Sequence, residues 1–498
     1  APEGDQSPSR RGLAWKKGRS LSFQPSRSCD DGAKAPGGLR RTRSFQAALA
    51  SMAEGADVPA RNEEASGLGI GQVVCFVWPI VITSFASTMI GLVDSAFVGR
   101  CGGALQLAAL APASSLLEGL SYVLSFVAIG TLNVLAGQGA KPSNDQDTLQ
   151  RLLSRSLAVA FVVGAAVATA ISLGASTAVR ACGAKGEMVP LAASYAGIRA
   201  IGLPFEMVYR VANAGLLSRH DSKSGLVIVV LQSLLNGLGD IVICPKFGIA
   251  GAAITTVSAQ CFGCCVALAV LVKRGVVKRF EAPELKDAVR FVLFALPLCL
   301  TLALKVAVVQ LLNAAASGSG VNNAAAHQIG KSVFWVFSLM ASESLSSSAQ
   351  ALLPGMLRSG QLNGAARTLR LLLMLASIGS VVSAGGLGLV IAKGGLSVFC
   401  TEADVLRRVP IVALCVAVFA TPFAFCLEGT QIAAQRQRWL SQRVLVLTVL
   451  TAAAFARAPA GDLALGWLWG SFAAYTVGRA IWYGWGVYGP GGVLAGAR

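Results

Sequence analysis

Residues 226–243 read LVIVVLQSLLNGLGDIVI, an apolar run interrupted by only a few polar side chains. A helix needs about 20 mainly apolar residues to cross the hydrocarbon core of a bilayer. The run is nearly continuous rather than alternating with period two, which favours a helix over a strand of a membrane barrel. It also contains small residues, through which membrane helices pack. This stretch therefore predicts a membrane-spanning helix.

Runs of this kind recur through most of the chain, which has 498 residues, 54% of them apolar and only 13% charged. The mean hydropathy is +0.64, which excludes an ordinary soluble protein. We expect an all-α polytopic membrane protein with about 12 spans. The first six expected spans are 72–98, 107–137, 152–173, 189–217, 226–243 and 250–272. The second six are 291–312, 325–353, 371–391, 411–433, 444–456 and 463–487.

The chain divides into three expected parts. Residues 1–66 are rich in Ser, Arg, Gly and Pro and have no apolar run, which predicts a disordered basic tail or an organelle transit peptide. Both alternatives stay open, because transit peptides are poor in acidic residues and this stretch contains several. Residues 67–280 would form a first lobe with helices 1–6, and residues 281–498 a second lobe with helices 7–12.

The formal net charge of +18 is carried by the tail and by the loops between apolar runs. Lys and Arg are more frequent in the loops on the side of the tail, which predicts that both termini face the cytoplasm or the stroma. This distribution argues against a nucleic-acid partner and for membrane lipids as the surroundings. The membrane would be a plastid envelope or another cellular membrane.

The two halves of the chain repeat each other at an offset of 217 or 218 positions. Asn133 matches Gln350 near the end of the second span of each half, and Asn213 matches Gln431 in the fourth. Related halves favour a cleft between the repeats, where transporters bind their substrates.

Ionisable residues inside the apolar runs are the candidates for function, since each costs roughly 2.5–3.5 kcal/mol at a helix centre. They are Asp94, Glu118, Glu206, Arg210, Asp240, Lys305, Glu343 and Glu428.

Asn236 and Asp240 are four residues apart, so one helix face presents both, and with Asp94 they would form a small polar cluster. In apolar surroundings the charged form of a carboxylate is disfavoured, which would let this cluster bind and release a proton. The alternative is that partners such as Arg210 or Lys305 neutralise these carboxylates permanently, or that they lie at the level of the lipid headgroups.

Other polar and aromatic side chains of the inner spans would line a substrate cavity. Glu343 and Glu428 would either meet a cationic substrate or pair with Lys305, and Tyr122 would either contact an organic cation or pack in the core. The expected cavity residues are Glu343, Glu428, Lys305, Tyr122, Asn213 and Gln350.

An enzyme or a metal site receives little support from the residue pattern. The 12 cysteines lie mostly within apolar runs and are not spaced as a disulfide framework. Cys261, Cys264 and Cys265 have no second pair or histidine nearby to complete a zinc site. The only histidines are His220 and His327, with no grouping of nucleophile and base. We expect no cofactor, no resident metal and no enzymatic activity.

Several motifs resemble those of the multidrug and toxic compound extrusion (MATE) transporters, in the branch similar to DNA-damage-inducible protein F that includes plant plastid members. The motifs are LVDSAFVGR at 92–100, EGLSY at 118–122, NGLGD at 236–240, FGIAGAA at 247–253 and AAHQI at 325–329. Their order and spacing cover most of residues 71–439.

This resemblance implies a V-shaped protein with two six-helix lobes, an antiporter that exports small organic solutes, which we expect to be organic cations. It places Asp94, Asn236 and Asp240 at the family's ion site of the first half, with H⁺ or Na⁺ as the coupling ion. The sequence departs from the branch at Lys305, Glu343, Glu428 and Asn213, where Arg, Asp, Asp and Gln are usual. A lipid or polysaccharide flippase of the same architecture is the alternative. We expect a monomer.

Overall fold

The computed structural model describes residues 68–138, 146–278, 281, 285–398, 403–461 and 463–497. Within these residues every regular element is a helix, so the chain is an all-α protein. The predicted tail, 1–66, lies outside the described residues. Among the described residues, eight helices, or nine with one bent pair, are long and apolar enough to cross a membrane.

The first half begins with α2 (Ile70–Leu124) and α3 (Phe126–Gln138), followed by α4 (Gln146–Ala181), α5 (Met188–Ala200), α6 (Leu203–Leu217) and α7 (Ser222–Lys273). The 55 residues of α2 would span about 80 Å if straight, at 1.5 Å per residue, which is more than twice a bilayer core. Val73 and Val77 share a core with Leu124 and Val127. The chain therefore returns to the end at which it began, and α2 supplies two spans.

The α7 helix also contains two spans, joined by a reversal at Gly248. This residue has φ 56°, a conformation that glycine adopts without steric cost. The Nε2 of Gln232 donates to the carbonyl oxygen of Ala259 at 3.3 Å, although the two residues are 27 positions apart. The two arms of α7 consequently lie side by side and antiparallel.

The fourth expected span, 189–217, is not one straight helix. It consists of α5 and α6, which are bent by 46° at a break after Ala200. Pro204 stands in the first turn of α6, where its missing N–H is tolerated but would interrupt a continuous helix.

The second half contains α8 (Leu285–Gly318), α9 (Val321–Arg358), α10 (Leu362–Ala392), α12 (Ile411–Ala433), α13 (Gln437–Ala456) and α14 (Leu463–Tyr488). A short 3₁₀ turn, Gly395–Val398, and α11 (Ala403–Arg407) lie between α10 and α12 and were not expected. The α13 helix begins seven residues earlier than predicted, because its first turns are polar and hydropathy alone assigns them to a loop.

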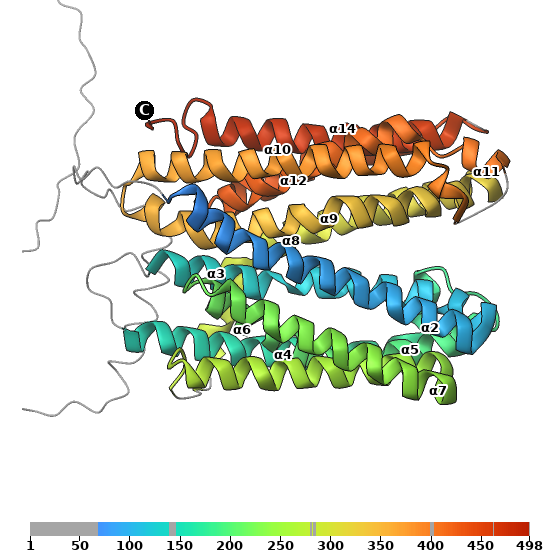
Figure 1. The fold of residues 1–498 in the computed structure, drawn as a ribbon, viewed down its shortest axis with the longest axis horizontal. Helices are drawn as coiled ribbons and strands as arrows, with labels where there is room; N and C mark the ends of the chain where they lie inside the picture. The colour runs from blue at the N-terminus through green and yellow to red at the C-terminus, as the bar shows by residue number, and fades with distance from the viewer. Residues whose placement is uncertain are drawn as a thin grey trace, which may run out of the picture. The chain divides into compact units, whose positions relative to one another are not determined.

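The described chain has twelve spans when the two arms of α7 are taken separately and the helices α9 and α14 are included. By mean hydropathy α7 is a single apolar segment, and α9 and α14 are less apolar than the other spans. These two helices are nevertheless 38 and 26 residues long, which is enough to cross a bilayer. The α9 helix carries many polar residues, and Trp, Tyr and Gly lower the hydropathy of α14. With the second arm of α7 and these two helices, each half of the described chain supplies six spans. Figure 1 shows the helices of the first half, from α2 to α7, and those of the second half, from α8 to α14.

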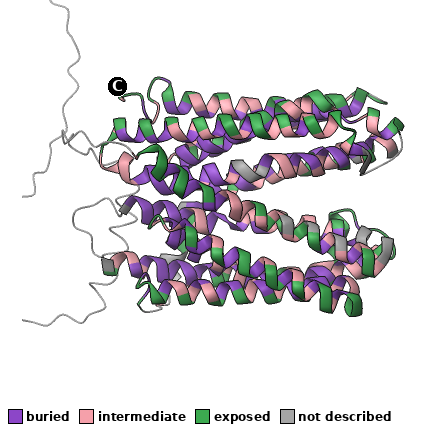
Figure 2. Ribbon diagram, viewed as in Figure 1, coloured by how far each residue is buried: buried purple, intermediate pink, exposed green. Residues whose placement is uncertain are grey.

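The two halves share a core at one end and have separate cores at the other. One cluster joins Val77, Leu124 and Leu345, and it reaches Leu494 near the C-terminus. Of the remaining large clusters, one contains only residues 98–253 and another only residues 308–475. Figure 2 shows buried residues gathered between the halves toward the end that carries the C-terminus. The halves are thus joined at this end and packed independently at the opposite one.

Candidate functional site

A buried polar cluster in the first half joins three helical segments. Asp94 comes from the first arm of α2, Asn236 and Asp240 from the first arm of α7, and Thr255 and Thr256 from its second arm. All five residues are buried, and Asp240 has no accessible surface. The reversal at Gly248 brings the two threonines to the carboxylates, 15 or more residues away in sequence.

The amide of Asn236 links the two carboxylates of this cluster. Its Nδ2 donates to Asp94 Oδ1 at 2.6 Å and to Asp240 Oδ2 at 3.2 Å. Thr256 Oγ1 donates to Asp94 Oδ2 at 3.0 Å, and Thr255 Oγ1 donates to Asp240 Oδ1. The Oδ1 of Asn236 is buried and accepts no hydrogen bond. One acceptor in the cluster is therefore open to an additional donor or to a cation.

Neither Asp94 nor Asp240 makes a salt bridge with any residue that the structure describes. Arg210 pairs instead with Glu206, and Lys305 with Glu428, so the neutralisation considered from sequence is absent at this cluster. Two adjacent carboxylates in a desolvated site cannot both be ionised without a large cost in free energy. The arrangement is suited to holding one proton or one cation between them.

Glu206 and Arg210 form a satisfied pair in the first half. Arg210 Nη2 lies 2.8 Å from Glu206 Oε1, one helical turn away. Gln260 Nε2 donates to Glu206 Oε2 at 3.0 Å, and Ser121 Oγ donates to Glu206 Oε1. The carboxylate of Glu206 thereby connects α2, α6 and α7, which is a structural role.

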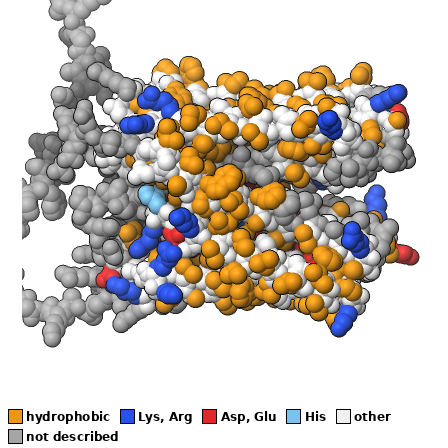
Figure 3. Space-filling model, in the orientation of Figure 1, with side chains coloured by type: hydrophobic (Ala, Val, Ile, Leu, Met, Phe, Trp, Pro, Cys, Tyr) orange, Lys and Arg blue, Asp and Glu red, His pale blue; other side chains and the backbone are white. Residues whose placement is uncertain are grey.

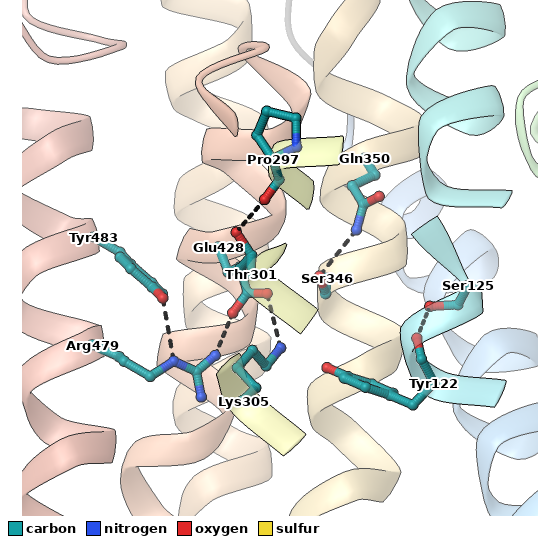
Figure 4. Close-up of polar contacts among 10 residues, drawn as sticks. All are labelled: Tyr122, Ser125, Pro297, Thr301, Lys305, Ser346, Gln350, Glu428, Arg479 and Tyr483. Carbon is teal, nitrogen blue, oxygen red and sulfur yellow. Dashed lines mark hydrogen bonds and ion pairs between the residues drawn. The ribbon is translucent and has the colours of Figure 1, made fainter. Parts of the chain in front are cut away.

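The second half has a buried ion cluster of its own (Figure 4). Lys305 Nζ lies 2.9 Å from Glu428 Oε1, and Arg479 Nη2 pairs with Glu428 Oε2. Arg479 Nε also donates to Tyr483 Oη at 3.3 Å. All three charged residues are buried. Both oxygens of the Glu428 carboxylate are occupied by cationic side chains.

Lys305 also joins the two halves. Its Nζ lies 4.3 Å from the ring centroid of Phe425 in its own half and 5.2 Å from that of Tyr122 in the first half. The structure thus brings three of the predicted cavity residues, Lys305, Glu428 and Tyr122, into one contact network.

Gln350 and Asn213 make contacts outside this network. Asn133 Nδ2 donates to Gln350 Oε1 at 3.2 Å, so the two repeat-related positions meet directly, and both are buried. Asn213 lies against Gly225 at the start of α7. No recorded contact joins Asn213 to Lys305 or Glu428 within the described chain.

Two further acidic residues face the space between the halves. Glu343 is half-buried and interacts electrostatically with Lys305 and Arg210. Glu118 is exposed, although it lies deep among protein atoms, and it interacts electrostatically with Lys331 of the other half. Neither carboxylate makes a salt bridge or a hydrogen bond with the residues described. These electrostatic interactions connect residues of the two halves.

Three charged residues of this interior were missed from sequence: Arg199, Lys331 and Arg479. The sequence does mark Arg479 as a candidate, because it is the only charged residue in the apolar run 463–488. Tyr475 and Tyr483 are buried around it.

Comparison with known proteins connects this architecture to transporters. The MatE family model matches residues 79–242. "Protein DETOXIFICATION 47, chloroplastic" from Arabidopsis thaliana is 27% identical over 441 residues, covering 85% of this chain and 79% of the relative. The "Probable multidrug resistance protein YpnP" from Bacillus subtilis is 30% identical over 204 residues, covering 38% and 42%.

Solved structures have the same fold. A MOP superfamily transporter from Pyrococcus furiosus superimposes with a TM-score of 0.73 at 19% identity, covering 84% of this chain and 97% of that one. A multidrug resistance MATE family transporter in an outward-facing conformation gives 0.72 at 20% identity, covering 84% and 94%. At these identities the likeness establishes the architecture of twelve helices in two lobes.

Proposed function

Because the chain belongs to the multidrug and toxic compound extrusion family of membrane transporters, we propose that it is a secondary active antiporter that exports small organic solutes in exchange for protons. It is an integral membrane transporter and not an enzyme. The observation that carries the proposal is the buried pair Asp94 and Asp240, which shares the amide of Asn236 and has no cationic partner among the described residues.

Proton binding is favoured over sodium binding by the donors already present. Asn236, Thr255 and Thr256 each donate to a carboxylate oxygen, which leaves few free lone pairs for a metal ion. A protonated carboxyl would instead supply the donor that Asn236 Oδ1 lacks. Sodium remains the alternative coupling ion that the experiment below tests.

Coupling is assigned to the first half alone. In the second half Lys305 and Arg479 occupy both oxygens of Glu428, so that carboxylate has no free site for a coupling ion. The ammonium of Lys305 takes the place that an exchangeable cation would need.

The proposed substrates are organic cations that bind between the lobes. Glu118 and Glu343 offer carboxylates without salt bridges in the described chain, one from each half. The ring of Tyr122 interacts electrostatically with Glu343 and lies 5.2 Å from Lys305 Nζ, and it would offer an organic cation a second cation–π contact. Protonation of the ion site would change which end of the cleft is closed, giving alternating access.

The proposed location is a plastid envelope, with both termini on the stromal or cytoplasmic side. Two similar plant proteins are named chloroplastic, and the excess of Lys and Arg in the loops of the tail side supports the orientation. We further propose a monomer surrounded by lipid that needs no cofactor and no resident metal.

Transport in proteoliposomes tests the proposal. A fluorescent organic cation would be followed under an imposed pH gradient or an imposed sodium gradient, with protein-free liposomes as control. We expect movement that follows the pH gradient and does not respond to sodium. Movement that follows only sodium would contradict proton coupling, and no movement under either gradient would favour an anionic substrate or a lipid flippase.

Glu343→Gln is expected to raise the apparent KM for an organic cation roughly tenfold or more at a similar maximal rate, because a charge-assisted contact is worth about 1.5–3 kcal/mol. The same assay measures it, and Glu187→Gln, in an exposed turn, is the matched control. An unchanged KM would remove Glu343 from the substrate site.

A further inference from the structure

Four basic side chains of the first half, at the end of the protein where the C-terminus lies, are paired with carboxylates. Arg274 Nη1, for example, lies 2.7 Å from Asp221 Oδ2. The other pairs at this end are Arg151 and Arg155 with Glu281, and Lys278 with Asp147. These four basic side chains therefore have carboxylate partners within the protein itself.

The corresponding end of the second half is different. Arg436 precedes α13, and Arg438 and Arg443 lie in its first two turns. None of them makes a salt bridge with a residue that the structure describes. Figure 3 shows charged side chains toward the two ends of the surface, with apolar side chains over its middle. This basic end therefore lacks its own counter-charge.

Two of these arginines meet at one indole ring. The Cζ of Arg436 lies 5.1 Å from the ring centroid of Trp439, and that of Arg443 lies 5.3 Å from the same ring. Arg443 also lies 5.1 Å from the ring of Trp482 on α14. We call these four residues, Arg436, Trp439, Arg443 and Trp482, the Arg–Trp site.

The Arg–Trp site holds two like charges with unused donor capacity. Arg436 Nη1 donates to the carbonyl oxygen of Gly486 at 2.8 Å, which fixes this side chain against α14. The Nε of Arg443 is buried and donates to no acceptor. Burial, and then the neighbouring Arg443, lower the pKa of Arg436, since both disfavour its positive charge. An anion bound between the two guanidinium groups would relieve the repulsion and accept the free N–H.

We propose that the Arg–Trp site binds the anionic headgroup of a membrane lipid through its phosphate or sulfonate oxygens. Guanidinium groups present planar N–H donors that match such oxygens, and tryptophan rings favour the depth of lipid headgroups. Basic pockets between helices at a membrane face are suited to anionic lipids.

The neighbouring surface favours a lipid over a soluble anion. Val446 and Leu450 follow Arg443 at spacings of three and seven residues, so they continue the same face of α13, and Leu450 is 61% exposed. On α14, Ile481 and Trp485 are four residues apart and also exposed. These side chains form an apolar path along which the acyl chains of a lipid bound at the Arg–Trp site would lie.

Native mass spectrometry of the full chain in detergent tests this proposal. The protein would be titrated with phosphatidylglycerol, with phosphatidylcholine, and with soluble glycerol 3-phosphate. We expect one tight phosphatidylglycerol site, binding of phosphatidylcholine at least tenfold weaker, and weaker binding still of glycerol 3-phosphate, which has no acyl chains. Arg443→Gln should weaken phosphatidylglycerol binding roughly tenfold.

Arg438→Gln is the matched control, because Arg438 is exposed on the same helix and has no recorded contact with either indole. It should retain the affinity of the unmodified chain. Equal phosphatidylglycerol affinity for the unmodified chain and Arg443→Gln would overturn the proposal. Equal affinity for glycerol 3-phosphate would show a site for free anions instead. If Arg443→Gln fails to fold, the comparison of the three ligands on the unmodified chain still decides.

Discussion

Asp240→Asn is expected to reduce proton-driven efflux to the level of protein-free liposomes. A carboxamide has nearly the shape of the carboxyl group, so it can still accept from Thr255 and pack against Asn236. It cannot bind and release a proton in the transport range of pH. Asp94 would then share the amide of Asn236 with a second amide instead of a second carboxylate, so we expect coupling to be lost rather than slowed.

Efflux of a fluorescent organic cation against an imposed pH gradient measures this effect. Asp404→Asn is the matched control, because Asp404 lies on α11, outside the spans, where hydrogen bonds from Asn322 and Arg408 hold its pKa below the ordinary value. It is ionised at neutral pH, yet its loss should leave transport unchanged. A thermal unfolding scan would show that both variants are folded. Undiminished efflux by Asp240→Asn would exclude this cluster as the coupling site.

Glu428→Gln is expected to destabilise the protein by about 3–5 kcal/mol, since it leaves two buried cations without their anion. Lys305 and Arg479 are only 8% and 4% exposed, so water cannot replace the carboxylate. The cost should appear as a lower free energy of unfolding in detergent, measured by denaturant titration or as a lower Tm.

A double-mutant cycle separates the ion pair from other effects of the substitution. Lys305→Met alone should also destabilise, because Glu428 loses one of two cationic partners. The double variant, Lys305→Met with Glu428→Gln, should cost less than the sum of the single ones, as residues in direct contact are not additive. A cost below about 1 kcal/mol for Glu428→Gln would mean that the cluster is solvated as a surface pair is.

The spans and the spacing of Asn236 and Asp240 were predictable from sequence, because both depend on local periodicity. Apolar runs long enough for a bilayer must become helices that satisfy their own backbone hydrogen bonds, whatever surrounds them. Residues four apart then share a face of that helix. For the same reason the expected bounds of the spans were wrong where the local pattern of apolar residues was ambiguous. These places are the bend between α5 and α6 and the polar start of α13.

Apart from the local pair of Glu206 and Arg210, the partners of the buried charged residues were decided by tertiary structure. Arg479 meets Glu428 across 51 positions, and Asn236 meets Asp94 across 142. Which of the buried carboxylates receives a cation depends on how helices from distant parts of the chain pack, since hydrogen bonds and ion pairs act only over a few ångströms. The number and type of spans therefore followed from the sequence by itself. The contrast between a carboxylate pair without a cation in the first half and a neutralised carboxylate in the second arose only when the helices were assembled.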